Sequence, residues 1–140
     1  MGMKIAICGS MSFAREMLEV KAALERLGHT CFLSELTEDF AKNPSWKRTR
    51  DEDARKKIEH DLIHKNWQTI QQSDAVLVLN YTKDEIPNYV GGNSFLELGF
   101  GFILGKKLFL LHKVPEMPFI KQEILGMQPT VLDGVLSNIQ

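Results

Sequence analysis

The chain has 140 residues, of which 44% are hydrophobic and 25% charged, a size and composition typical of one folded domain. Its formal charge of −1 at pH 7 argues against nucleic acid as a partner, because nucleic-acid binding requires a basic surface. No apolar run approaches the ~20 residues of a membrane span, so no membrane partner is expected. We therefore expect a single domain over residues 1–140.

The N-terminal part of the chain predicts a strand, a helix and a second strand. Residues 4–8 (KIAIC) form a short apolar run, which is typical of a strand buried on both faces. Apolar residues then recur at helical spacing, with Gly28 as the C-cap: Phe13, Met17, Val20, Leu24 and Leu27. Residues 29–33 predict the second strand, which such a unit places parallel to the first.

Both cysteines of the chain fall inside these two predicted strands. Cys8 and Cys31 are therefore expected to be reduced core residues rather than a disulfide pair. Reduced core cysteines are typical of a cytoplasmic protein, and we expect that location.

Residues 34–53 form a long polar connection that contains Pro44 and Trp46. Connections of this length are often functional. Trp46 is either a lid residue that stacks on a ligand or a residue that pins the connection to the domain. The charges that follow are of mixed sign and predict a solvated helix start rather than a phosphate site: Lys47, Arg48, Arg50, Asp51, Glu52, Asp53, Arg55, Lys56 and Lys57.

A helix is expected to follow this charged segment and to end at about residue 72. Its inner stripe includes Ile58, Leu62 and Ile70. His60 and His64 lie four residues apart on this helix, a spacing that suits a metal site. No third ligand is evident, so we expect neither a metal nor another cofactor.

The C-terminal half predicts three further strands. Residues 74–80 form the most central strand, residues 108–111 the fourth and residues 130–132 the fifth, with a short helix at about 119–125. Apolar strands that alternate with helices indicate a parallel sheet covered on both faces. The predicted fold is therefore an α/β, flavodoxin-like or Rossmann-like three-layer sandwich with a five-stranded parallel sheet.

The most unusual stretch is residues 88–107, NYVGGNSFLELGFGFILGKK. Glu97 is the only charged residue between Gly91 and Gly105. Ser94 and Glu97 have the spacing of a helix-capping box, so Glu97 is either a capping residue or a functional carboxylate. We expect Glu97 in the first turn of a buried helix, where the helix dipole favours the ionised form that a nucleophile needs.

In a parallel sheet, a ligand binds outside the carboxyl ends of the strands. Three segments are expected to meet there: residues 9–12 after the first strand, residues 80–94 after the third, and His112 after the fourth. The turn after the first strand lacks the GxGxxG pattern of dinucleotide-binding proteins. Gly99, Gly101 and Gly105 lie inside the predicted helix and are interpreted as close-packing positions or as a helix–helix contact.

Several of these segments resemble one family. Cys8-Gly9-Ser10 closing the first strand, residues 73–76 (SDAV) opening the third, and residues 92–107 around Glu97 are similar to the nucleoside 2-deoxyribosyltransferase superfamily, which includes the 2′-deoxynucleoside 5′-phosphate N-hydrolases. The resemblance covers most of the chain in order. It implies that Glu97 is the nucleophile that attacks the anomeric carbon, and that Gly9 and Ser10 hold the sugar or its 5′ group.

The sequence departs from the family pattern at three places. Asn66 stands where the family commonly has an aspartate that helps the base leave, and Gly91 stands where it has an aspartate or serine. No arginine follows Ser10 within residues 11–13, where the nucleotide hydrolases bind phosphate. The groups available to replace the missing acid are Tyr81, Asp84, Glu85 and His112.

We therefore expect an N-glycosidase or deoxyribosyl transferase that acts on a nucleoside or nucleotide, with Glu97 and Asn66 in the catalytic positions. The residues predicted to bind substrate are Cys8, Gly9, Ser10, Met11, Asn80, Tyr81, Gly91, Gly92, Asn93, Ser94 and His112. Two alternatives stay open: an inactive nucleotide-binding or sensing module, and an interaction domain in which Glu97 only caps a helix. Apolar residues on the Glu97 helix predict a homo-oligomer, a dimer or larger: Phe95, Phe100 and Phe102.

Overall fold

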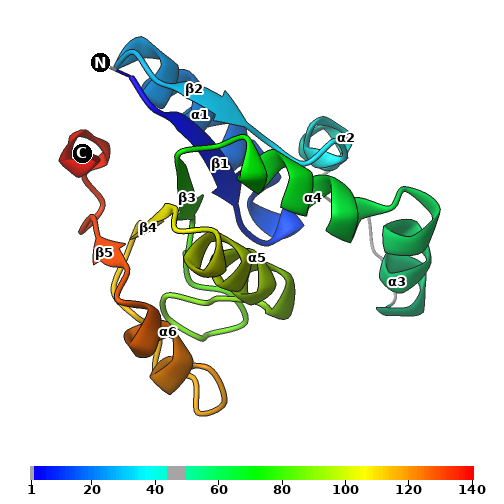
Figure 1. Cartoon of the computed structure of the whole chain (residues 1–140). Helices are drawn as coiled ribbons and strands as arrows, with labels where there is room; N and C mark the ends of the chain where they lie inside the picture. The colour runs from blue at the N-terminus through cyan, green and yellow to red at the C-terminus, as the bar shows by residue number, and fades with distance from the viewer. Residues whose placement is uncertain (1, 44–49) are drawn as a thin grey trace.

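A computed structural model describes residues 2–43 and 50–140 of the chain. Five strands form one parallel sheet in the order β2-β1-β3-β4-β5 (Figure 1). Their bounds are β1 Lys4–Cys8, β2 Thr30–Phe32, β3 Ala75–Val78, β4 Lys107–Leu110 and β5 Thr130–Val131. This is the flavodoxin-like strand order, so the predicted fold and all five predicted strands are confirmed.

Helices cover both faces of the sheet. One face carries the short 3-10 turn η1 (Met11–Phe13), helix α1 (Ala14–Arg26) and the C-terminal 3-10 turn η2 (Leu136–Asn138). The other face carries α4 (Leu62–Gln71), α5 (Gly92–Ile103) and α6 (Lys121–Met127). Two further helices, α2 (Thr37–Lys42) and α3 (Arg50–Glu59), pack against α1 and α4 respectively.

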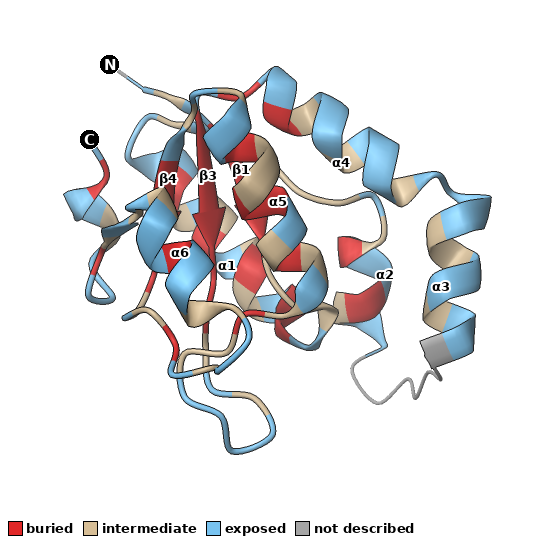
Figure 2. Ribbon diagram, turned by 60° about the horizontal axis from the view of Figure 1, so that its bottom comes forward, coloured by how far each residue is buried: buried red, intermediate tan, exposed pale blue. Residues whose placement is uncertain are grey.

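The core is divided in two by the sheet, and alternate residues of each strand serve the two halves. Ile5 and Ile7 of β1 pack toward α1, whereas Ala6 and Cys8 of the same strand pack toward α4, α5 and α6. Strand β3 is buried from end to end, and β1 and β4 are buried except at their first residues, Lys4 and Lys107 (red in Figure 2). Burial on both faces explains why these strands are continuous apolar runs in the sequence. Within the described ranges, no helix combines the length and apolar character needed to cross a membrane.

Three predictions between β2 and β3 are wrong. Residues 37–42, expected in an irregular connection, form helix α2, whose Phe40 is buried. The single helix expected up to residue 72 is two helices, because Asp61 adopts a left-handed conformation (φ 50°) that interrupts it. Ile58, expected on the inner stripe, is 80% exposed on α3. Pro44, Trp46, Lys47 and Arg48 lie outside the described residues.

Helix α5 begins earlier than its sequence pattern predicts. Gly91 is the N-cap, so Ser94 lies inside the helix and Glu97 beyond its first turn. The capping-box reading and the placement of Glu97 in the first turn are therefore wrong. The helix is also not buried all round, since Glu97 and Leu98 face the core while Phe102 and Ile103 are exposed.

The glycines of α5 have different roles. A Cβ atom on Gly101 would lie 2.7 Å from Val76 Cγ2 and 2.8 Å from Leu108 Cδ2, so this glycine is the close-packing position against the sheet. Gly99 has no neighbour of this kind within 4 Å, and Gly105 follows the helix with φ +71°. The prediction of close packing therefore holds for Gly101 alone.

Candidate active site

A cavity of about 240 Å³ opens at the carboxyl ends of the central strands. Part of its lining comes from residues 8–11 at the end of β1, Ser34 and Leu36 after β2, and Tyr89 and residues 91–94 after β3. In the strand order β2-β1-β3 the chain reverses direction across the sheet at β1, and such a switch point is where α/β sheets bind ligands. The cavity lies at the edge of the sheet that the sequence predicts.

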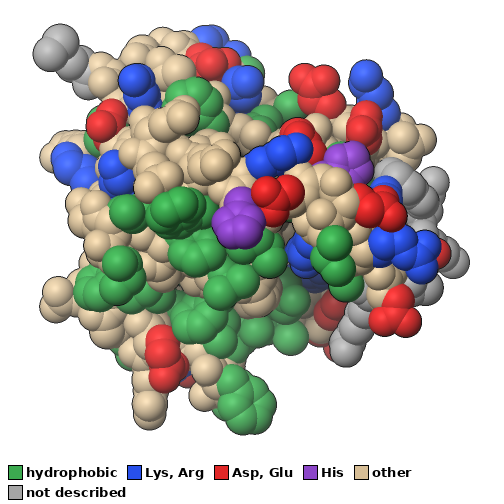
Figure 3. All heavy atoms as spheres, turned by 45° about the vertical axis from the view of Figure 1, so that its right-hand side comes forward, with side chains coloured by type: hydrophobic (Ala, Val, Ile, Leu, Met, Phe, Trp, Pro, Cys, Tyr) green, Lys and Arg blue, Asp and Glu red, His purple; other side chains and the backbone are tan. Residues whose placement is uncertain are grey.

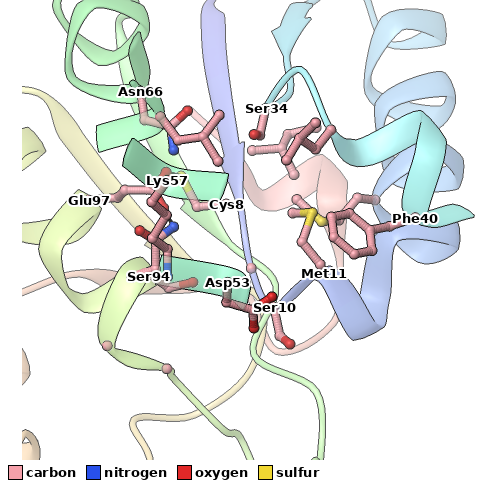
Figure 4. A pocket seen from close by; sticks show the side chains of 18 of the residues that line it. Cys8, Ser10, Met11, Ser34, Phe40, Asp53, Lys57, Asn66, Ser94 and Glu97 are labelled. Carbon is pink, nitrogen blue, oxygen red and sulfur yellow. Dashed lines mark hydrogen bonds between the residues drawn. The ribbon is translucent and has the colours of Figure 1, made fainter. Parts of the chain in front are cut away.

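Glu97 reaches this cavity from the inner face of α5 and is 7% exposed. Both of its carboxylate oxygens accept a hydrogen bond. Asn93 Nδ2, one turn earlier on the same helix, donates to Oε1 at 2.7 Å. Cys8 Sγ, at the end of β1, donates to Oε2 at 3.0 Å. The two donors fix the orientation of the carboxylate from two different elements. Figure 4 shows Cys8 and Glu97 side by side.

The surroundings of Glu97 make its carboxyl group easier to protonate than usual. Burial raises the pKa of Glu97 from 4.5 to about 7, although the hydrogen bond from Cys8 and the positive charge of Lys57 act in the opposite direction. The expectation that the helix dipole keeps this group ionised is therefore wrong, because desolvation outweighs every favourable interaction. Near neutral pH the group is divided between its ionised and neutral forms.

Cys8 serves as a hydrogen-bond donor rather than as a thiolate. Burial raises the pKa of the Cys8 thiol well above its ordinary value, and the charge of Glu97 and the hydrogen bond to it raise it further. The thiol therefore keeps its proton at neutral pH and directs it to Glu97.

Helix α3 contributes residues that sequence reasoning assigned to a solvated surface. Asp53, Lys56 and Lys57 line the cavity, and Lys57 is close enough to Glu97 to lower its pKa. In Figure 4, Lys57 lies on the same side of the cavity as Glu97. The mixed charge run gave no signal for this placement, because the turn of the chain at Asp61 decides which way α3 points.

Asn66 lies on α4 and lines the cavity, on the same side as Glu97 in Figure 4. Its amide can donate and accept hydrogen bonds but has no acidic proton. Met11 and Phe40 are on the opposite side in the same view and provide an apolar wall. A ligand in this cavity therefore lies between a polar wall and an apolar one.

The loop after β3 brings Lys83 to the cavity, a residue that the sequence did not single out. Lys83 Nζ donates to Ser10 Oγ at 2.8 Å and lies 5.2 Å from the centre of the Tyr89 ring. Ser10 and Lys83 are 73 residues apart in the chain, so only the fold brings them together.

Ten of the predicted site residues line the cavity: Cys8, Gly9, Ser10, Met11, Asn66, Gly91, Gly92, Asn93, Ser94 and Glu97. The other three lie outside its lining. Asn80 is buried and holds the loop after β4, because its amide group donates to the carbonyl oxygens of His112 and Lys113 and accepts from the His112 N–H. Tyr81 packs edge-on against Phe13 and His112.

The acids considered as replacements for an aspartate at position 66 are not at the cavity. Asp84 and Glu85 are the exposed central residues of a tight turn, with φ values of 50° and 64°. Among the described residues, no group of three His, Cys, Asp or Glu side chains is arranged to hold a metal ion. His60 instead contacts Glu35 at 3.1 Å, and His64 contacts Asp61 at 2.8 Å.

No protein-family model matches the chain, and no curated protein matches it significantly in sequence. Among solved structures, the chain is similar to the CMP N-glycosidase BcmB of Clostridium botulinum. The two are 12% identical, with a TM-score of 0.48, and the similarity covers 91% of this chain and 84% of that one. A similarity of this size does not identify a shared activity.

Proposed function

We propose that the cavity is the active site of an N-glycosidase or N-glycosyl transferase that acts on a nucleoside or nucleotide, with Glu97 as the nucleophile. One observation carries the proposal: a buried carboxylate at the switch point of the sheet is held by two donors, from Cys8 and Asn93. Burying such a group is costly, and the cost is typical of a carboxylate with a chemical role.

In the proposed first step, a Glu97 oxygen attacks the anomeric carbon of the sugar as the bond from this carbon to the base nitrogen breaks. The electron pair of that bond leaves with the base, which takes a proton. Positive charge that develops on the sugar ring is stabilised by the adjacent carboxylate, and a glycosyl ester of Glu97 results. Water then attacks the same anomeric carbon as the bond from this carbon to the Glu97 oxygen breaks. The sugar, or sugar phosphate, leaves with the hydroxyl group, the second proton of the water passes to the solvent, and the carboxylate is restored. A second base in place of water gives the transferase reaction.

The two walls of the cavity fit this chemistry. The apolar side chains of Met11 and Phe40 offer a surface against which a planar base can pack. Asn66 can hydrogen-bond the departing base on the polar side. Because Asn66 has no acidic proton, the proton that the base acquires comes from water, from the ligand itself or from Asp53, the other carboxyl group in the cavity lining.

The experiment that tests the proposal is base release. Purified protein is incubated with a panel of ribo- and deoxyribonucleosides and their 5′-monophosphates, and free base is followed by chromatography. Release by the wild type, lowered on the order of a thousandfold or more by Glu97→Gln, is expected. Glu25→Gln, an exposed position on α1 outside the cavity, is the matched control and should retain activity. Equal rates for the wild type and Glu97→Gln would contradict the assignment of the nucleophile.

A second function is favoured by Asn66. A cavity with an amide in place of an acid at position 66 is also suited to bind a nucleotide without cleaving it. In that case no compound of the panel releases base, but one of them raises the melting temperature of the protein. At saturation the bound ligand adds about a few kcal/mol to the free energy of unfolding. The same samples serve for both measurements.

The predicted homo-oligomer rests on the outer face of α5. Hydrophobic side chains gather into one broad area on the face seen in Figure 3. A groove of about 520 Å³ runs between α5 and α6. Among the described residues that line it, Glu123 alone is charged, and the others are Phe95, Leu96, Gly99, Phe100, Phe102, Ile103, Gly126 and Met127. We propose that a second copy of the chain covers this face, and light scattering tests it.

A further inference from the structure

The contact between Ser10 and Lys83 joins two walls of the cavity. Neither Ser10 nor the Tyr89 ring neutralises the positive charge of Lys83. Lys83 is half-buried, and its ammonium group bonds to a neutral hydroxyl and packs over a neutral ring. Among the described residues, no carboxylate forms an ion pair with it. A half-buried ammonium group without a counter-ion bears a desolvation cost that an anionic ligand would offset.

The hydrogen-bonding capacity of this pair points to the same kind of ligand. Ser10 Oγ accepts from Lys83 Nζ at 2.8 Å and from the Ser12 N–H at 3.3 Å, so both of its acceptor positions are in use. What remains to Ser10 is its O–H donor, and an ammonium group with one of its three N–H groups engaged has two left. The pair therefore presents donors only, which suits a ligand group that is rich in acceptors and negatively charged.

Backbone hydrogen bonds fix the loop that carries Lys83. Lys83 and Ile86 exchange two backbone hydrogen bonds of 3.1 and 2.9 Å, which close a tight turn. The Tyr89 N–H donates to the Tyr81 carbonyl oxygen at 3.0 Å and closes the base of the same loop. The backbone of Lys83 is thus fixed, and its ammonium group is held by Ser10 Oγ and the Tyr89 ring, so little side-chain freedom is lost on binding.

The charge of the whole cavity agrees with this reading. Three lysines line it, Lys56, Lys57 and Lys83, against two acidic residues, Asp53 and Glu97. Glu97 is in addition partly neutral near pH 7. In Figure 4, Ser10 lies apart from Glu97 along the cavity, so one ligand can face the carboxylate with one end and Ser10 with the other.

We infer that Lys83 and Ser10 form the subsite for the 5′-phosphate of the ligand, and that the protein therefore prefers nucleoside 5′-monophosphates to nucleosides. This inference rests on the proposed function for the identity of the sugar and base. Lys83, contributed by the loop after β3, is the specificity-determining residue. A charge-assisted hydrogen bond from it accounts for a preference of about tenfold or more.

Binding is measured in the Glu97→Gln background, so that turnover does not consume the ligand. The dissociation constant of each nucleoside is compared with that of its 5′-monophosphate by calorimetry, and the ratio of the two is the readout. The ratio is expected to be about tenfold or more with Lys83 present, to fall within about twofold in Lys83→Met, and to be retained in Lys83→Arg. Lys113→Met, which removes an exposed lysine outside the cavity, should leave the ratio unchanged.

Three outcomes would overturn the inference. The first is equal affinity for nucleosides and their 5′-monophosphates. The second is a ratio that Lys83→Met leaves unchanged while the variant melts like the Lys113→Met control. The third is that inorganic phosphate alone competes for the site as well as the 5′-monophosphates do, because the subsite would then bind free phosphate.

The outcome for the proposed function is separate. If the wild type releases no base but the Lys83-dependent ratio persists, the catalytic proposal fails and the phosphate subsite stands. If nucleosides and 5′-monophosphates release base with equal kcat/KM and bind equally well, the catalytic proposal stands and the phosphate subsite fails.

Discussion

The pH dependence of base release tests the state of the nucleophile. Only the ionised carboxylate attacks carbon, and burial raises the pKa of Glu97 from 4.5 to about 7. Below that pH, kcat/KM should therefore fall about tenfold for each pH unit. A carboxylate of ordinary pKa would instead hold the activity level down to about pH 5.

Replacing Cys8 by alanine changes this profile in a defined direction. The variant loses the thiol that donates to Glu97 Oε2 at 3.0 Å, an interaction that favours the ionised form. A net hydrogen bond is worth ~0.5–1.5 kcal/mol, and 1.36 kcal/mol corresponds to one pKa unit. The acid limb of Cys8→Ala should therefore lie about half a pH unit to one unit higher than that of the wild type.

Cys8→Ser is the matched control, because its hydroxyl group keeps a donor at the same place. The assay is kcat/KM of base release for the three proteins from about pH 5 to about pH 9, with the melting temperature of each recorded at both ends. An acid limb near pH 4.5 in the wild type would refute the assignment of burial as the dominant effect. Identical limbs for Cys8→Ala and the wild type would refute the role of the thiol.

Three further predictions concern stability and assembly. Between pH 4.5 and about 7, the folded protein holds a proton on Glu97 that the unfolded chain has released, so stability falls as the pH rises through this window. Glu97→Gln should therefore gain up to about 3 kcal/mol over the wild type at pH 8 but not at pH 4, as thermal unfolding at the two pH values will show. Gly101→Ala should cost about 1–3 kcal/mol because its Cβ meets Val76 and Leu108 at 2.7 and 2.8 Å, whereas Gly99→Ala should not destabilise; equal denaturation midpoints would contradict this. Light scattering should give at least the mass of a dimer for the wild type and the mass of a monomer for Phe102→Asp. A monomeric wild type would contradict the proposed homo-oligomer.

The strands were predictable because the sheet buries both of their faces. Such strands appear in the sequence as short apolar runs, and the five runs of this kind each predict a buried strand. The topology of the sheet then places the residues after β1 and β3 at one edge, so Gly9, Ser10 and Glu97 could be assigned to a common cavity before the structure was known.

The parts that were missed depend on backbone choices that leave little trace in a sequence. Asp61 interrupts a helical pattern without glycine or proline, because aspartate tolerates the left-handed conformation. The start of α5 was misplaced because Ser94 and Glu97 have capping-box spacing by coincidence, while Gly91 provides the actual N-cap. The pKa of Glu97 was predicted in the wrong direction for the same reason. Because the helix begins three residues earlier than predicted, Glu97 lies in the buried part of the helix and not at its N-terminal end.

The break at Asp61 has a consequence for how this protein can diversify. Glu97, Cys8 and Asn93 belong to elements whose positions the sheet dictates, while α3 is joined to α4 through the left-handed junction. Insertions, deletions or shuffled sequences ahead of that junction can therefore rebuild one wall of the cavity without moving the nucleophile. Libraries confined to residues 51–57 are accordingly a natural starting point for the directed evolution of new substrate ranges on this scaffold.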